Sequence, residues 1–237
     1  MPGLSPHAPY SVSMDLFQSL AEIAVRERVP LCLHLAETPA ELEILESGTG
    51  EFVEMLAAFG LWREDLIPCG TRPIDFLRGL ADVETALVAH GNYFADDEIR
   101  WLGEHPNVST VFCPRTHHFF GHPAHPWLKL IEAGASVSIG TDGRSSNPDY
   151  SLWNELRFLD ERTNGFRRQL LLELGTIQGA AALGRQVETG TITVGKRADF
   201  SVISLPENDC TDPWSLLFAP GSKATSFAGT GSSELTE

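Results

Sequence analysis

Lysine and arginine are scarce in this chain of 237 residues. There are 17 of them against 32 aspartates and glutamates, which gives a formal net charge of −15. A surface with this excess of negative charge repels a phosphate backbone, and the sequence has no Lys/Arg-rich stretch that could serve as a local docking site. We therefore expect no nucleic-acid partner.

Long apolar runs and paired cysteines are also missing. The sequence has no run of 18 apolar residues, and its first segment, MPGLSPHAPYSVS, lacks the basic-then-apolar order of a secretion signal. The cysteines are dispersed, without a CxxC pair, at Cys32, Cys69, Cys113 and Cys210. These absences predict a protein with free thiols that has no membrane partner and resides in the cytoplasm.

What the sequence does contain, up to residue 184, is an alternation of short apolar runs with longer helical patterns. This alternation is typical of an α/β fold in which helices cover a parallel sheet. Strands are expected at Val29–His34, Thr85–His90, Asn107–Cys113 and Ala135–Asp142. Helices are expected at Met14–Arg28, Asp96–Glu104, Pro126–Ala133, Tyr150–Glu161, Arg167–Leu174 and Thr176–Leu183, and directly after the cap Thr38-Pro39-Ala40-Glu41.

The pattern changes after residue 184. Gly190–Ser204 has alternating β-branched residues interrupted by Gly195, which predicts a hairpin or the edge of a sandwich. Residues 185–220 are therefore expected to form a small β appendage. Residues 221–237 are rich in serine, threonine and glycine without a periodic apolar pattern, so we expect a disordered tail there.

Three of the expected strands end on a residue that can bind a metal or move a proton. These residues are His34, His90 and Asp142, and His7 is a fourth candidate near the N-terminus. The carboxyl ends of parallel strands in a β/α barrel converge on one face, where active sites are built. Each histidine alone could be a core residue, and Asp142-Gly143 alone could be a common turn. Their shared position favours a functional cluster.

Glu37 strengthens this interpretation because it follows His34 by three residues, where the chain leaves the strand. It is either a solvated loop carboxylate or a general acid and base beside a metal-bound water. Likewise His90-Gly91 is either an ordinary turn, with a positive φ at the glycine, or a site where the imidazole polarises the substrate or binds the metal.

A histidine-rich segment follows the expected strand Asn107–Cys113. His117, His118, His122 and His125 could bind a metal, line a substrate pocket or face solvent, and we favour the pocket. Arg115, just before them, is interpreted as a contact for an anionic or carbonyl group of the substrate, with a surface arginine as the alternative.

Taken together, these motifs resemble a known family. SPHAPYSVS, HLAET, VAHG, CPR and SIGTDG, followed by ETGTITVGKRADFSVI, are similar to the amidohydrolase superfamily. Within it they resemble the aminohydrolase branch of adenosine-like, guanine and cytosine deaminases and triazine chlorohydrolases. The resemblance implies that residues 1–184 form the C-terminal part of a TIM-like (β/α)8 barrel, about strands 4–8, and that residues 185–220 belong to a composite β-sandwich.

The resemblance also implies roles for the candidate residues. His34 and Asp142 would bind one divalent metal ion, with zinc favoured over iron, and Glu37 would be the proton shuttle. His90 would lie near the reacting carbon, and Asp142 would share in the proton transfer. His7 would contact the substrate, as would Glu37. The implied reaction is hydrolysis of a non-peptide carbon-nitrogen bond by metal-activated water, most simply the deamination of a cyclic amidine of purine or pyrimidine type.

Two departures limit the resemblance. The His-x-His that the family carries at its first barrel strand does not occur in this sequence, and the chain opens at the motif that the family places after strand four. We therefore expect an N-terminally truncated barrel that lacks half of the metal ligands. The alternative hypothesis is a non-catalytic half-barrel that acts only by assembling with another chain or with itself as a homo-oligomer.

Overall fold

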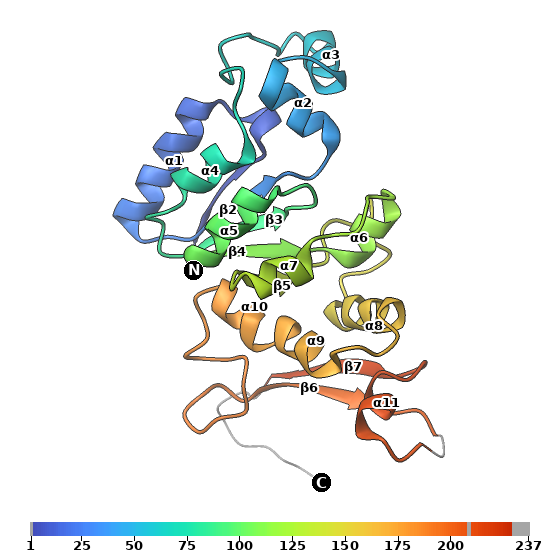
Figure 1. Ribbon diagram of the computed structural model, residues 1–237. Helices are drawn as coiled ribbons and strands as arrows, with labels where there is room; N and C mark the ends of the chain where they lie inside the picture. The colour runs from blue at the N-terminus through green and yellow to red at the C-terminus, as the bar shows by residue number, and fades with distance from the viewer. Residues whose placement is uncertain (1, 208–209, 229–237) are drawn as a thin grey trace.

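The computed structural model describes residues 2–207 and 210–228, and its centre is a five-stranded parallel sheet (Figure 1). The strand order follows the chain, β1-β2-β3-β4-β5, with every neighbouring pair parallel. The strands are β1 (Leu4–His7), β2 (Leu31–Leu35), β3 (Ala86–His90), β4 (Val108–Phe112) and β5 (Ser136–Ile139). The predicted α/β fold with a partial barrel is confirmed.

Helices connect the strands, and several of them pack against one face of the sheet. They are α1 (Met14–Glu27), α2 (Pro39–Ser47), α3 (Glu51–Ala58), α4 (Pro73–Gly79), α5 (Asp96–Glu104), α6 (Pro114–Phe119), α7 (Trp127–Glu132), α8 (Leu152–Arg162), α9 (Arg168–Gly175) and α10 (Ile177–Ala182), with a 3-10 turn at Pro9–Ser11. Within the described part of the chain, no helix is long and apolar enough to cross a membrane.

The alternation of side chains along β2 separates the two faces of the sheet. Leu31, Leu33 and Leu35 are buried, whereas Cys32 and His34 between them are half-exposed. Because successive side chains of a strand point to opposite faces, the leucines face the helices and His34 lies on the other face. The helix-side core is continued by Phe17, Phe76, Leu102 and Leu130 from α1, α4, α5 and α7.

The predicted helices and strands lie close to where the sequence placed them, with one informative difference at β5, whereas no element was predicted at the positions of β1, α3, α4 and α6. The strand ends at Ile139, three residues before the predicted end at Asp142. Asp142 has a φ of 54°, in the left-handed region, which cannot continue an extended strand. The predicted helix after Thr38 is confirmed, because the Thr38 hydroxyl accepts a hydrogen bond from the Glu41 N–H.

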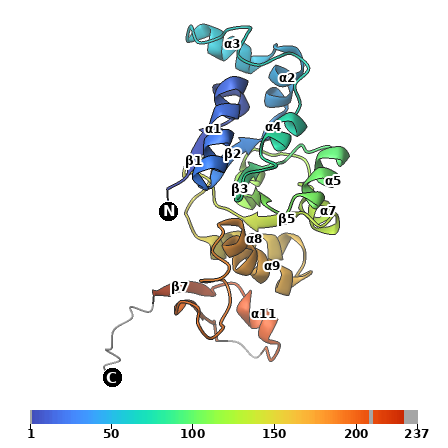
Figure 2. The ribbon, with the colours of Figure 1, turned by 90° about the vertical axis from the view of Figure 1, so that its left-hand side faces the viewer.

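The C-terminal part differs more from the prediction. The strand β6 (Asp199–Ser204) pairs with β7 (Lys223–Ala228) in an antiparallel ribbon, and α11 (Pro213–Leu217) lies between them in the chain. Both views place the ribbon at the opposite end of the molecule from α3 (Figures 1 and 2). The expectation of a loose segment from residue 221 was therefore wrong for β7, and residues 229–237 lie outside the described part.

The residues before β6 do not form the predicted hairpin. Ile192 and Val194 alternate as in a strand, yet both are almost fully exposed and belong to no strand. Local bonds hold this segment instead, since the Lys196 ammonium donates to the carbonyl of Thr189 at 3.1 Å and the Arg197 N–H donates to that of Glu188 at 2.9 Å. The β-branched alternation was a correct signal for β6 only.

Candidate metal and catalytic site

Three predicted site residues meet at the carboxyl ends of the strands. His34 lies in β2, His90 ends β3 and Asp142 follows β5. One potential ligand atom from each lies within 4.8 Å of the others, and in the part of the chain that the structure describes no other three such side chains come this close. The cluster is half-buried at His34 and Asp142 and buried at His90. Residues far apart in the sequence thus form one donor set.

The hydrogen bonding of His34 suits a metal ligand. Its Nδ1 atom lies 3.1 Å from the carbonyl oxygen of His7, an acceptor, so Nδ1 is the protonated nitrogen. The lone pair is then on Nε2. Metal-binding histidines typically donate their other N–H to a backbone carbonyl in this way. Two imidazoles and one carboxylate are also a donor set that fits zinc with one open position.

The backbone is strained where these residues lie. His7, His90 and Asp142 have φ values of 64°, 72° and 54°, in the left-handed region that non-glycine residues seldom adopt. Gly91 continues this conformation with a φ of 64°, and a Cβ there would lie 2.4 Å from the Phe94 ring. Strain of this kind persists where the surrounding structure holds it, and it concentrates at functional sites.

Glu37 lies beside the cluster in the turn between β2 and α2. Its Oε1 atom is 3.6 Å from Nε2 of His90, and its side chain is 18% exposed against 4% for His90. The separation is slightly longer than a hydrogen bond. Glu37 thus adds a second, largely buried carboxyl group next to the cluster.

Burial moves the pKa values of these two groups in opposite directions. Desolvation raises the pKa of Glu37, an effect that the nearby His34 opposes and Asp142 reinforces. Desolvation, followed by the charge of His34, lowers the pKa of His90 to about 4. His90 is thus neutral at neutral pH, with a nitrogen available for a metal or a substrate, while Glu37 holds a proton more readily than an exposed glutamate.

Hydroxyl groups approach the third member of the cluster, Asp142. The Ser146 hydroxyl lies 3.3 Å from Oδ2 of Asp142, and the hydroxyls of Ser146 and Thr116 are 2.9 Å apart. Both hydroxyl residues are buried. They limit the orientations open to the Asp142 carboxylate.

Arg115 is bound by carboxylates of the protein itself. Its Nε atom donates to Oε1 of Glu155 at 2.6 Å and its Nη2 to Oδ1 of Asp149, also at 2.6 Å. Its backbone N–H bonds Glu155 as well, at 2.9 Å. The arginine therefore joins the start of α6 to α8, and its donors point at carboxylates of its own chain.

The histidine-rich segment forms a separate group behind His90. His125 donates from Nε2 to the His90 carbonyl at 2.8 Å and stacks on Phe112 with ring centroids 3.9 Å apart. His117 and His122 are neighbours in the same group, which borders a hollow of about 270 Å³ between α6, α7 and α8. These histidines lie outside the donor set of His34, His90 and Asp142.

The sequence interpretation missed two contributors to the site. Glu41 was interpreted as part of a helix cap, but its carboxylate accepts hydrogen bonds from the backbone of Ala36 and Glu37. Asn92, two residues after His90, donates from Nδ2 to the Glu37 carbonyl at 3.0 Å. The one sequence signal for these two residues is their position, since Glu41 lies shortly after HLAE and Asn92 shortly after VAH.

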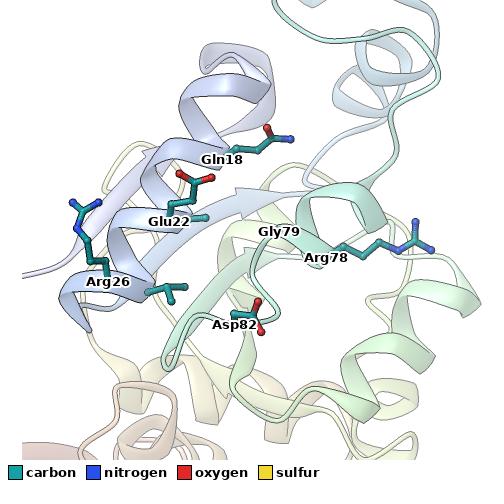
Figure 3. A pocket seen from close by; sticks show the side chains of 8 residues that line it. Gln18, Glu22, Arg26, Arg78, Gly79 and Asp82 are labelled. Carbon is teal, nitrogen blue, oxygen red and sulfur yellow. The ribbon is translucent and has the colours of Figure 1, made fainter.

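A second hollow, of about 460 Å³, lies away from this chemistry (Figure 3). It lies between α1 and α4 on the helix side. Its lining includes charged side chains of both signs, from Glu22, Arg26, Arg78 and Asp82. None of the clustered residues lines this hollow, so the candidate metal site at the strand ends is separate from it.

Comparison with known proteins identifies relatives of this chain. The model of the Amidohydrolase family matches residues 1–233. The chain is 28% identical over 213 residues to the 5-methylthioadenosine/S-adenosylhomocysteine deaminase of Thermodesulfovibrio yellowstonii, covering 86% of this chain and 44% of that protein. The chain thus spans about half the length of the curated relatives it matches.

Two solved structures extend the likeness to three dimensions. The aminofutalosine deaminase of Helicobacter pylori matches with a TM-score of 0.74 and 30% identity, over 86% of this chain and 51% of that one. An adenosine deaminase from Xanthomonas campestris with bound zinc matches with a TM-score of 0.69 and 25% identity, over 92% of this chain and 47% of that one.

Proposed function

This chain belongs to the amidohydrolase family, and from that premise we propose that it carries the proton-transfer half of a metal-dependent aminohydrolase site. The proposed reaction is hydrolysis of a non-peptide carbon-nitrogen bond in a cyclic amidine, with release of ammonia. The observation that carries the proposal is the meeting of His34, His90 and Asp142 within 4.8 Å. Glu37 lies 3.6 Å from His90 beside them.

A divalent ion fits this donor set, and we propose zinc in preference to iron. His34 and Asp142 would hold it, and His90 is close enough to be a third ligand or to act on the substrate. The imidazole nitrogens of His34 and His90 and the Asp142 carboxylate suit a borderline metal with nitrogen and oxygen ligands. When bound, such an ion lowers the pKa of water and so supplies a nucleophile at neutral pH.

Each side chain then has a distinct task. Glu37, whose pKa is raised by burial, takes a proton from the attacking water and returns it to the amidine nitrogen of the substrate. Asp142, oriented by Ser146, shares the transfer of a proton to the leaving amine. His90, neutral and buried, orients the reacting carbon. His7 contacts the substrate beside His34, from which its ring centroid is 5.3 Å distant.

The substrate class follows from the chemistry and from the names of the relatives. Relatives that deaminate methylthioadenosine, S-adenosylhomocysteine or aminofutalosine all act on an amino group attached to an sp² carbon of a ring. We propose a small molecule with that group for this chain, and a reducing, cytoplasmic setting supported by the free thiols of Cys32, Cys69 and Cys113.

The test is direct. The chain is purified and its bound zinc and iron are measured, and ammonia release is then assayed with a panel of aminopurines, their nucleosides and aminopyrimidines. Bound metal with turnover supports the proposal. If neither appears, a second chain that supplies a His-x-His strand is added, and turnover that is still absent contradicts the proposal.

A second candidate is a half-barrel that acts by assembly, and two observations favour it. The parallel sheet is open at β1 and β5 in the described part of the chain, and open edges invite pairing. The β6–β7 ribbon exposes Phe200, Val202 and Phe227. Sedimentation of the purified chain tests this candidate, which predicts a stable dimer or a complex and is contradicted by a monomer at micromolar concentration.

A further inference from the structure

The turn after β2 is held by an unusual carboxylate. Glu41 is 0% exposed. Its Oε1 accepts the Ala36 N–H at 2.7 Å and its Oε2 accepts the Glu37 N–H at 2.9 Å. Both oxygens are therefore used on two consecutive backbone donors, immediately before the residue proposed to carry the proton.

Burial of the Glu41 carboxylate costs free energy that its interactions must offset. Burial raises its pKa to about 7, the two backbone hydrogen bonds oppose that rise, and the charge of Glu37 adds to it. No cation contributes to this balance. A buried carboxylate without a cation destabilises a protein unless its hydrogen bonds compensate, so the two N–H bonds are its compensation.

The backbone that Glu41 holds would not adopt this shape by itself. Ala36 has a φ of 53°, in the left-handed region that is unfavourable for alanine. In this conformation the N–H groups of Ala36 and Glu37 both point toward α2, and the two oxygens of Glu41 bind them together.

The same turn is joined to the turn that follows β3. Gly91 N–H donates to the Leu35 carbonyl at 2.9 Å and Tyr93 N–H donates to the Ala36 carbonyl at 3.1 Å. The Asn92 side chain donates to the Glu37 carbonyl at 3.0 Å. The backbone of Glu37 is thus bound on one side by Glu41 and on the other by the segment that begins at His90.

From this geometry we propose that Glu41 is a positioning residue, which holds the Glu37 backbone so that its carboxylate faces His90. The inference rests on the proposed function, because Glu37 is its proton carrier. Glu41 contacts neither His34 nor Asp142, so it acts only through Glu37 and Ala36.

The chain offers a matched control at Glu98. This glutamate is 1% exposed, and its Oε2 accepts the Ala95 N–H at 2.7 Å at the start of α5. Burial raises its pKa as well. Glu98 therefore resembles Glu41 in burial and in backbone contact, but it contacts no residue of the site. It differs in that its Oε1 also accepts from Nη2 of Arg72 at 3.2 Å. A purely structural role for Glu41 would make Glu41→Gln and Glu98→Gln equivalent in kinetics.

The experiment compares the unaltered chain with its Glu41→Gln and Glu98→Gln variants, together with Glu41→Asp in case the glutamine variant does not fold. Crystal structures measure the distance from Glu37 to His90, and kinetics measure kcat and KM. The NH2 group of a glutamine cannot accept a hydrogen bond, so one of the two backbone N–H groups of Ala36 and Glu37 loses its acceptor. We therefore expect the Glu37 carboxylate to move away from His90 in Glu41→Gln. We expect kcat to fall about 100-fold with little change in KM, in the range that general acid-base catalysis supplies.

The Glu98→Gln variant should keep its kcat within about twofold, since it lies outside the proton-transfer geometry. The proposal is overturned if Glu37 stays at its original distance from His90 in both Glu41 variants, or if their kcat equals that of Glu98→Gln. Turnover that is absent from the unaltered chain even after the His-x-His chain is added would count against the proposed function instead, and the crystal structures would still decide the role of Glu41.

Discussion

Nε2 of His90 lies 3.6 Å from Oε1 of Glu37, at the point where two strand ends meet. Both groups are largely shielded from water, and burial favours the neutral form of each. The contact is thus not an ion pair at neutral pH. The contact places a carboxyl group next to a neutral imidazole, an arrangement that suits the proton transfer we propose for Glu37.

The first prediction concerns this carboxylate. Glu37→Gln keeps the size of the side chain but cannot carry a proton between water and substrate, so we expect kcat to fall by about 10²–10⁴. Bound metal, measured by elemental analysis, should be unchanged because His34 and Asp142 remain. Loss of metal in Glu37→Gln would reassign Glu37 as a ligand.

The second prediction decides between the two roles open to His90. His90→Asn should leave zinc bound and reduce turnover if the imidazole only orients the substrate. It should reduce zinc affinity as strongly as His34→Asn does if His90 is a third ligand, because its potential ligand atom lies within 4.8 Å of the other two. Zinc titration of both variants against the unaltered chain separates these outcomes, and we expect zinc to stay bound in His90→Asn.

The third prediction concerns Arg115, which the sequence suggested as a substrate contact. Its guanidinium is paired with Glu155, whose side chain is 0% exposed. Arg115→Met would leave that carboxylate buried and unpaired, so we expect a loss of about 3–5 kcal/mol in the free energy of unfolding by urea. Substrate affinity in the folded fraction should change little.

The control for this measurement is the exposed pair of Arg63 and Asp65, whose side chains are 68% and 70% exposed. Arg63→Met should alter the unfolding free energy far less, because water screens both charges. A raised KM in Arg115→Met without a loss of stability would restore the substrate-contact interpretation.

Sequence patterns predicted the sheet because the signals for its strands and for the adjoining helix starts lie in neighbouring residues. The apolar run that ends at His34 and the helix cap at Thr38 each depend on a few neighbouring residues, and both lie where expected. The meeting of His34, His90 and Asp142 could be inferred because parallel strands bring their carboxyl ends to one edge.

The features that sequence patterns missed depend on contacts between distant segments. The pairing of β6 with β7 joins residues that begin at Asp199 and Lys223, and nothing within either strand specifies the other. The Arg115 pair with Glu155 crosses from α6 to α8 in the same way. Glu41 was missed for another reason, since a glutamate at the third position of a helix normally bonds the cap itself.

The last prediction concerns acid stability and His125. Burial lowers the pKa of this imidazole to about 3, whereas an exposed histidine in the unfolded chain titrates near pH 6.5. Between these values the unfolded chain binds a proton that the folded chain excludes, so this group makes the protein less stable as the pH falls below about 6.5. The slope is about 1.4 kcal/mol per pH unit for one proton.

His125→Gln removes the titrating group but can still donate to the His90 carbonyl. The free energy of unfolding by urea, measured at intervals from pH 7 to pH 4, should therefore fall less steeply with pH in the variant, by nearly the slope of one proton. Equal slopes in the two proteins would show that His125 takes up its proton without unfolding.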